Sequence, residues 1–127
     1  MKMISTSDSP TPAGHYSQAV VHGDLVFVSG QLAVDAATGQ KHAGTIEQQT
    51  KIALDNVAAI LRAAGSDVDR VLKTTVYISD IELWGRVNEV YAEFFGSHRP
   101  ARAVVPTRDL HHGLLVEIEA IGTVREA

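Results

Sequence analysis

The sequence predicts an α+β domain in which two helices pack on one face of a mixed β-sheet. Apolar residues recur at helical spacing after Thr45 and after Asp80, and runs rich in β-branched residues flank those segments in the order ββαβαββ. The 127 residues suit one domain. We therefore treat 1–127 as a single domain that begins with an irregular arm over residues 1–14, which are rich in Ser, Thr and Pro.

The segment 16–32 predicts a β-hairpin. Two apolar runs flank the triplet 22–24, and Gly23 supplies the positive φ that a tight turn needs. A second turn is expected around Gly39.

Residues 45–64 predict the first helix. Thr45 and Gln48 have the spacing of a capping box, and Gly65 supplies a stop signal. The apolar positions that recur at helical spacing are Ile46, Ala53, Val57, Ile60, Leu61 and Ala64.

The remaining elements are a strand, a helix and two further strands. The run 71–78 is dense in β-branched residues, and Asp80 is the candidate N-cap of a second helix that extends to about Phe95. Residues 102–107 predict the next strand, and residues 114–124 predict the last one, with strict alternation of side chains.

The apolar runs 25–28 and 103–105 have consecutive apolar residues, a pattern typical of a sheet that is covered on both faces. Two helices can cover only one face. We therefore expect a second copy of the chain to cover the other face in a homo-oligomer.

Composition excludes several classes of function. The chain has no cysteine, so it has neither disulfides nor thiolate chemistry. A net charge of -4, with 11 Lys and Arg residues scattered along the chain, makes nucleic acid an unexpected partner. No run is long and apolar enough for a membrane span, and the N-terminus lacks the apolar core of a secretory signal, so we expect a soluble cytoplasmic protein.

Metal and nucleotide sites are also not expected. His111 and His112 are adjacent, so on a strand they would point to opposite faces, and no pair of histidines has helical ligand spacing. The glycines form no phosphate-binding loop. The sequence therefore predicts no metal and no cofactor.

Two charged features are candidates for chemistry. Glu117 and Glu119 alternate along the last strand, so they share one face, which is either a solvated acidic surface or part of a partly dry cleft where a carboxylate activates water. Arg102 opens an apolar strand, either as a solvated strand end or as a bidentate anchor for a carboxylate. The residues alone leave both choices open.

Two weaker candidates accompany them. The triplet Ser29, Gly30 and Gln31 ends a strand, where its backbone amides either bind an anion or form an ordinary turn. Asn88 lies beside the apolar stripe of the second helix, as a structural hydrogen-bonding residue or as a ligand contact.

Seven segments in order resemble the Rid family, also called RidA or YjgF, the reactive intermediate imine/enamine deaminases. The resemblance extends from Gly14 to the end of the chain. The segments are GHYSQAV (14–20), FVSGQL (27–32), DNVAAILRAAG (55–65), VLKTTVYISD (71–80), VNEVYAEFF (87–95), RPAR (99–102) and VEIEAI (116–121).

The resemblance implies a chorismate-mutase-like protomer that assembles as a homotrimer with intersubunit clefts. It also implies hydrolysis of 2-imino acids, such as 2-iminobutanoate and 2-iminopropanoate, to 2-keto acids and ammonia. No cofactor is implied for this reaction. It implies that Arg102 binds the substrate carboxylate and that Glu119 holds or activates water. The cleft positions that it implies are Tyr16, Ser29, Gly30, Asn88 and Val104.

The sequence departs from many members of that family near the expected cleft. His15 replaces a frequent proline, and Val104 replaces a frequent cysteine, although its backbone N–H can still bind a ligand. The segment LHHG (110–113) replaces a proline-containing turn, and the loop before RPAR is short. These changes bear on substrate preference, and we expect His15 or His111 to line the mouth of the site, with His112 as a further candidate.

Two rival functions are a non-catalytic trimer that binds a small carboxylate or a partner, and an endoribonuclease or translation inhibitor. The presence of both Arg102 and Glu119 counts against the first rival. The acidic net charge counts against the second.

Overall fold

The structure is a computed structural model that describes residues 1–125. It confirms the predicted α+β class, with two α-helices on a mixed sheet of six strands among the described residues. In chain order the elements are β1 (Lys2–Ile4), β2 (Ala19–His22), β3 (Leu25–Gln31), α1 (Ile46–Ala63), η1 (Val68–Arg70), β4 (Val71–Ile78), η2 (Ile81–Leu83), α2 (Trp84–Phe95), β5 (Ala101–Pro106), η3 (His111–Gly113) and β6 (Val116–Thr123).

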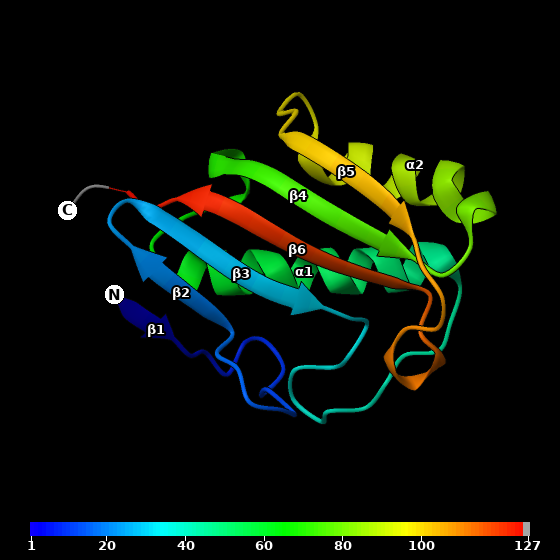
Figure 1. Ribbon diagram of the computed structural model, residues 1–127, viewed down its shortest axis with the longest axis horizontal. Helices are drawn as coiled ribbons and strands as arrows, with labels where there is room; N and C mark the ends of the chain where they lie inside the picture. Colours follow the sequence, from blue (N-terminus) through cyan, green and yellow to red (C-terminus); the bar gives the residue numbers. More distant parts are fainter. Residues whose placement is uncertain (126–127) are drawn as a thin grey trace.

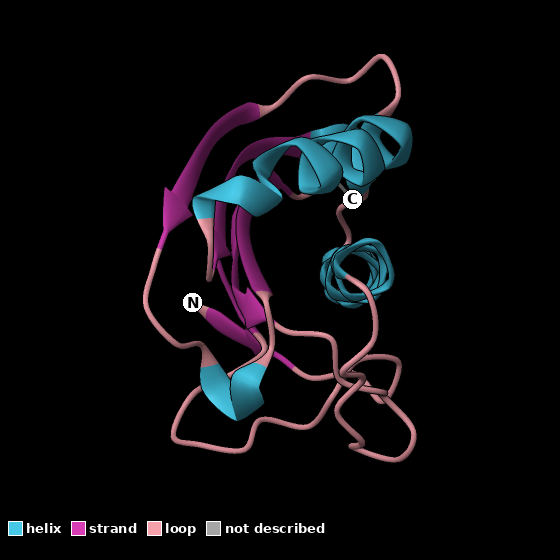
Figure 2. Cartoon of the chain, turned by 90° about the vertical axis from the view of Figure 1, so that its right-hand side faces the viewer, coloured by secondary structure: helices cyan, strands magenta, loops and turns pink. Residues whose placement is uncertain are grey.

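The sheet has the strand order β1-β2-β3-β6-β4-β5 (Figure 1). β4 and β5 are parallel, and every other neighbouring pair is antiparallel. Figure 2 shows α1 and α2 on the same side of the curved sheet. Among residues 1–125, neither α1 nor α2 covers the other face of the sheet, and the strand order makes β5 an edge strand.

The N-terminal arm differs from the prediction, because residues 2–4 form β1 and pair with β2. The side chain of Gln18 holds the rest of the arm by accepting a hydrogen bond from the Thr6 N–H at 2.7 Å and donating to the carbonyls of Thr6, Ser9 and Pro10. This contact joins residues far apart in the chain, so local composition did not reveal it.

The first helix follows the prediction at its start. The Thr45 hydroxyl accepts a hydrogen bond from the Gln48 N–H at 3.2 Å, and the Gln48 side chain accepts one from the Thr45 N–H at 3.0 Å. The second helix starts later than predicted. Asp80 caps the short helix η2 by accepting from the Glu82 N–H at 2.9 Å, and α2 begins only at Trp84.

The buried residues of the strands face the two helices. Val116, Ile118 and Ala120 of β6 are buried, so the residues that alternate with them point to the helix-free side, which we call the open face. Phe27 and Val105 are 43% and 37% exposed there. The open face carries Phe27, Thr75, Tyr77, Ala103, Val105, Glu117, Glu119 and Ile121.

No helix of the described residues is both long and apolar enough to cross a membrane.

Candidate functional site

Arg102 lies in a hollow of about 500 Å³ between β5 and α2. Its guanidinium donates a hydrogen bond to the Asn88 side chain at 2.8 Å, and its central carbon is 4.7 Å from the ring centre of Tyr91 and 5.5 Å from that of Trp84. The Tyr91 ring is in turn held by a 2.7 Å hydrogen bond between its hydroxyl and Thr74. The arginine is thus fixed on two aromatic rings while most of its five N–H donors stay available for an anion.

A second hollow of about 580 Å³ contains three of the predicted cleft residues, Tyr16, Ser29 and Gly30. The Ser29 hydroxyl donates to the carbonyl of Ser17 at 2.7 Å, which ties the end of β3 to the segment that carries Tyr16. His111 lines this hollow, as the sequence predicts. His112 also lines it, whereas His15 is not among the lining residues.

Glu117 also lines this second hollow, and the sequence did not single it out there. Burial raises the pKa of the Glu117 carboxyl, with a smaller rise from Glu119, while the nearby His111 acts in the opposite direction. A Cβ atom on Gly30 would overlap the Glu117 carboxylate, so this glycine makes the space that Glu117 occupies. The alternation of residues 116–121 was the available signal, but it could not tell which glutamate borders the hollow.

Glu119 is in a different place on the open face. Its carboxylate accepts a hydrogen bond from the Tyr77 hydroxyl at 2.8 Å, and this bond is the main reason that the pKa of Tyr77 is raised. Glu119 borders a smaller hollow of about 230 Å³, together with Phe27, Lys73 and Thr75.

The sheet register keeps Arg102 and Glu119 apart within one chain. Arg102 is opposite Thr74 of β4, and Glu119 is opposite Thr75, the next residue of the same strand. Neighbouring residues of a strand point to opposite faces, so Arg102 is on the helix side and Glu119 is on the open face. One copy of the chain therefore does not bring the two predicted catalytic residues together.

Val104 points to the same side as Arg102, and its side chain packs against the hydrophobic core. It lines none of the hollows described above. A contact between the substrate and Val104 stays a prediction, and only its backbone on the edge strand β5 is placed to make one.

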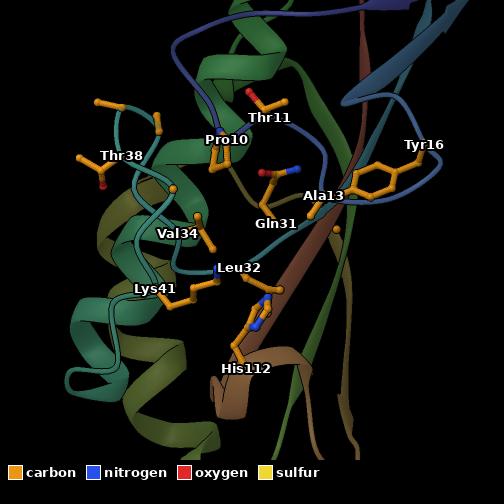
Figure 3. Close-up of a pocket in the computed structure, with 14 residues that line it drawn as sticks. Pro10, Thr11, Ala13, Tyr16, Gln31, Leu32, Val34, Thr38, Lys41 and His112 are labelled. Atoms are coloured by element: carbon orange, nitrogen blue, oxygen red, sulfur yellow. The ribbon is translucent and has the colours of Figure 1, made fainter.

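A third region adjoins the Tyr16 hollow and is shown in Figure 3. It has a volume of about 390 Å³ and shares Tyr16, Gly30, Leu32 and His112 with the second hollow. Lys41 is the charged side chain among the residues that line it. The two hollows thus form one continuous depression beside the end of β3.

Among residues 1–125, no three His, Asp or Glu side chains are close enough to hold a metal ion together. The described residues thus offer a guanidinium with free donors on the helix side of the sheet and two carboxylates on the open face.

Comparison with known proteins identifies the family. Residues 6–124 match the model of the family described as Endoribonuclease L-PSP. A RutC family protein of Pyrococcus horikoshii is 44% identical over 120 residues, covering 94% of this chain and 95% of that protein. The 2-iminobutanoate/2-iminopropanoate deaminase of Rattus norvegicus is 45% identical over 120 residues, covering 94% of this chain and 88% of that protein.

Solved structures agree with this match. The E. coli TdcF structure with bound serine has a TM-score of 0.93 and 39% identity, and covers 99% of this chain and 100% of that one. The structure of the E. coli YjgF gene product has a TM-score of 0.93 and 38% identity, and the match covers 98% of this chain and 100% of that one. The chain belongs to the Endoribonuclease L-PSP family, which confirms the resemblance to the Rid (RidA/YjgF) proteins.

Proposed function

We propose that the protein is a homotrimeric deaminase that hydrolyses 2-imino acids, such as 2-iminobutanoate and 2-iminopropanoate, to 2-keto acids and ammonia. The deaminase names of relatives such as the rat protein support this substrate class. The proposal assigns Arg102 to the substrate carboxylate and Glu119 to the attacking water, with Tyr16, Ser29, Gly30 and Asn88 around them.

The observation that carries the proposal is the separation of Arg102 and Glu119 on opposite faces of the sheet. A site that uses both residues must combine Arg102 of the partner subunit with Glu119 of this one. The open face carries exposed apolar side chains, Phe27 and Val105, that a second copy would bury. β5 is an edge strand, so Arg102 lies at a border of the sheet that a second copy can approach.

The reaction suits such a site because it needs positioning more than strong activation. The imine carbon is already electrophilic, so a bidentate hold on the carboxylate orients it toward a bound water. Glu119 accepts a proton from that water as its oxygen bonds to the imine carbon. Glu119 returns that proton to nitrogen, and the hydroxyl proton also passes to nitrogen as the carbonyl forms. The carbon–nitrogen bond breaks with its electron pair on nitrogen, and ammonia leaves.

A coupled assay tests the activity. A threonine dehydratase supplied with threonine generates the imine, semicarbazide traps it, and the wild-type protein should divert the flux to 2-ketobutyrate. No diversion by the wild type would refute the proposal, and so would full diversion by Arg102→Ala. Binding of small carboxylates without turnover would favour the non-catalytic alternative, and cleavage of RNA would favour the ribonuclease.

Mixing two inactive variants tests whether the site lies between subunits. Arg102→Ala and Glu119→Gln chains are refolded together in equal amounts. If each site takes its arginine and its glutamate from different copies, about a quarter of the sites in the mixture are intact. The activity should then recover to about a quarter of the wild-type activity. If both residues act within one chain, no mixed oligomer has an intact site, and the absence of recovery would refute the intersubunit arrangement.

A further inference from the structure

Glu117 is an acidic side chain that the family resemblance leaves without a role. It lies on β6 opposite Tyr77 of β4, and it borders the same hollow as Tyr16, Ser29 and Gly30. Among residues 1–125 its carboxylate has no hydrogen-bond partner within the chain. A half-buried carboxyl group that faces a hollow without a partner is free to contact a bound molecule.

The backbone around Glu117 leaves room for this carboxyl group. Gly30 has no side chain at the point where a Cβ would overlap the Glu117 carboxylate. Gly30 lies at the end of β3, next to Ser29, whose hydroxyl is held at 2.7 Å by the carbonyl of Ser17. The position of the carboxyl is thus determined by β3 and β6 together rather than by a flexible loop.

Glu117 and Glu119 have different surroundings although they share a face. Glu117 borders the Tyr16 hollow and Glu119 borders the smaller hollow with Phe27. Their Cα atoms are only about 6.8 Å apart along the strand, a distance that a small substrate with a bound water can span. Glu119 accepts the hydrogen bond from Tyr77, whereas Glu117 borders the Tyr16 hollow, where burial raises the pKa of its carboxyl. Pairs of carboxyl groups whose environments differ in this way are typical of sites where one group gives a proton and the other takes one.

We propose that Glu117 donates the proton to the imine nitrogen, while Glu119 takes the proton of the attacking water. This inference rests on the proposed function and assigns a second catalytic carboxyl to the same site. The hollow beside Gly30 then receives the nitrogen end of the imine.

The proton transfers balance over one turnover. Glu117 gives its carboxyl proton to the imine nitrogen, the water oxygen bonds to the imine carbon, and Glu119 takes the proton that the water loses. In the second half Glu119 passes that proton to the amine nitrogen, and Glu117 takes the hydroxyl proton as the carbonyl forms. The carbon–nitrogen bond breaks with its electron pair on nitrogen, ammonia leaves, and both carboxyls return to their starting forms.

Charged and titratable groups around Glu117 set the pH dependence. They are His111 and His112 from η3, Tyr16 from the segment before β2, Tyr77 from β4 and Glu119 from β6. A proton donor must be protonated, so kcat should fall as the pH rises above the pKa of Glu117. His111 lowers that pKa, so replacing His111 with Ala should move the fall in kcat to higher pH.

The experiment compares Glu117→Gln with Glu93→Gln in the coupled assay. Glu93 is an exposed glutamate of α2, so its variant is a control for the loss of one carboxylate. Glu117→Gln should lower kcat about 100-fold, the low end for a general acid, with little change in KM, and should remove the alkaline fall in kcat. Glu117→Asp retains a carboxyl and should keep more activity than Glu117→Gln.

Two readouts separate a catalytic role from a structural one. Thermal unfolding and light scattering should give each Glu117 variant the wild-type fold and oligomer mass. If the wild type is active and Glu117→Gln matches Glu93→Gln, or if Glu117→Asp is no better than Glu117→Gln, this inference is wrong and the proposed function stands. If the wild type hydrolyses no imine, the proposed function itself fails and this inference fails with it.

Discussion

Replacing Arg102 with lysine keeps the positive charge of the proposed anchor but removes its planar fork. In the structure the guanidinium donates to Asn88 at 2.8 Å and lies 4.7 Å from the ring centre of Tyr91. A lysine ammonium presents one point charge, so it cannot hold both oxygens of a carboxylate in parallel and stacks less well on the ring. The substitution therefore isolates geometry from charge.

The expected loss follows from these contacts. One charge-assisted hydrogen bond contributes about 1.5–3 kcal/mol, and the contact with the aromatic ring adds about 0.5–1 kcal/mol. Losing both gives about 2–4 kcal/mol, which corresponds to a decrease in kcat/KM of about 30- to 1,000-fold. Most of it should appear in KM, because the carboxylate is held in the ground state and in the transition state alike.

The assay is the coupled production of 2-ketobutyrate from threonine, with the imine concentration varied through the amount of dehydratase. Arg62→Lys is the matched control, because Arg62 is an exposed arginine near the end of α1. Thermal unfolding of both variants checks that the contact with Tyr91 is not needed for folding. A kcat/KM of Arg102→Lys within threefold of that of Arg62→Lys would show that Arg102 does not clamp the substrate.

Four further changes test other parts of the structure. Gly30→Ala should displace the Glu117 side chain and reduce imine hydrolysis at least as much as Glu117→Gln does. The overpacking should also lower the free energy of urea unfolding by about 1–3 kcal/mol. Unchanged turnover would contradict the proposed role of Gly30 in making space for Glu117. Glu117→Gln should raise the free energy of unfolding at pH 8 but not at pH 4. The reason is that burial raises the pKa of Glu117 in the folded state above its value in the unfolded state. The wild type therefore loses stability as the pH rises through the pKa of the folded state, whereas the neutral glutamine does not. If Glu117→Gln changed the free energy of unfolding equally at both pH values, the ionisation of Glu117 would not affect stability. Phe27→Glu places a charge on the open face and should lower the mass of the proposed trimer in light scattering toward that of the monomer. A mass equal to that of the wild type would argue against an interface there. Thr45→Ala should lower the urea-unfolding free energy by about 1 kcal/mol, because the cap on the Gln48 N–H is lost, and no change would mean that water replaces the cap.

The elements that the sequence predicted well are those governed by neighbours in the chain. The turn at Gly23 has a φ of 62°, and the capping box of Thr45 and Gln48 forms as expected. The strict alternation of residues 116–123 gives alternating buried and half-buried side chains. Each depends on a few consecutive residues, so periodicity and turn chemistry were sufficient.

The predictions that failed depended on partners far away in the chain. The arm was expected to be irregular, but Gln18 holds it and residues 2–4 join the sheet. Asp80 caps a short helix instead of α2, because one more turn of chain intervenes before Trp84.

The sequence by itself identified the candidate residues for chemistry. Arg102, Glu117 and Glu119 are its charged candidates on apolar strands, and alternation already placed the two glutamates on one face. It also determined that one sheet face would lack a helix, because two helical segments cannot cover both sides.

Only the tertiary structure decided how those residues are distributed. The register of β4 with β5 and β6 places Arg102 on the helix side and both glutamates on the open face, and the end of β3 brings Gly30 against Glu117 but not against Glu119. Strand register depends on pairing between segments remote in the chain, and a shift of one residue would exchange the two faces. Local sequence patterns therefore identified the candidate groups, and the pairing of the strands determined which of them share a face of the sheet.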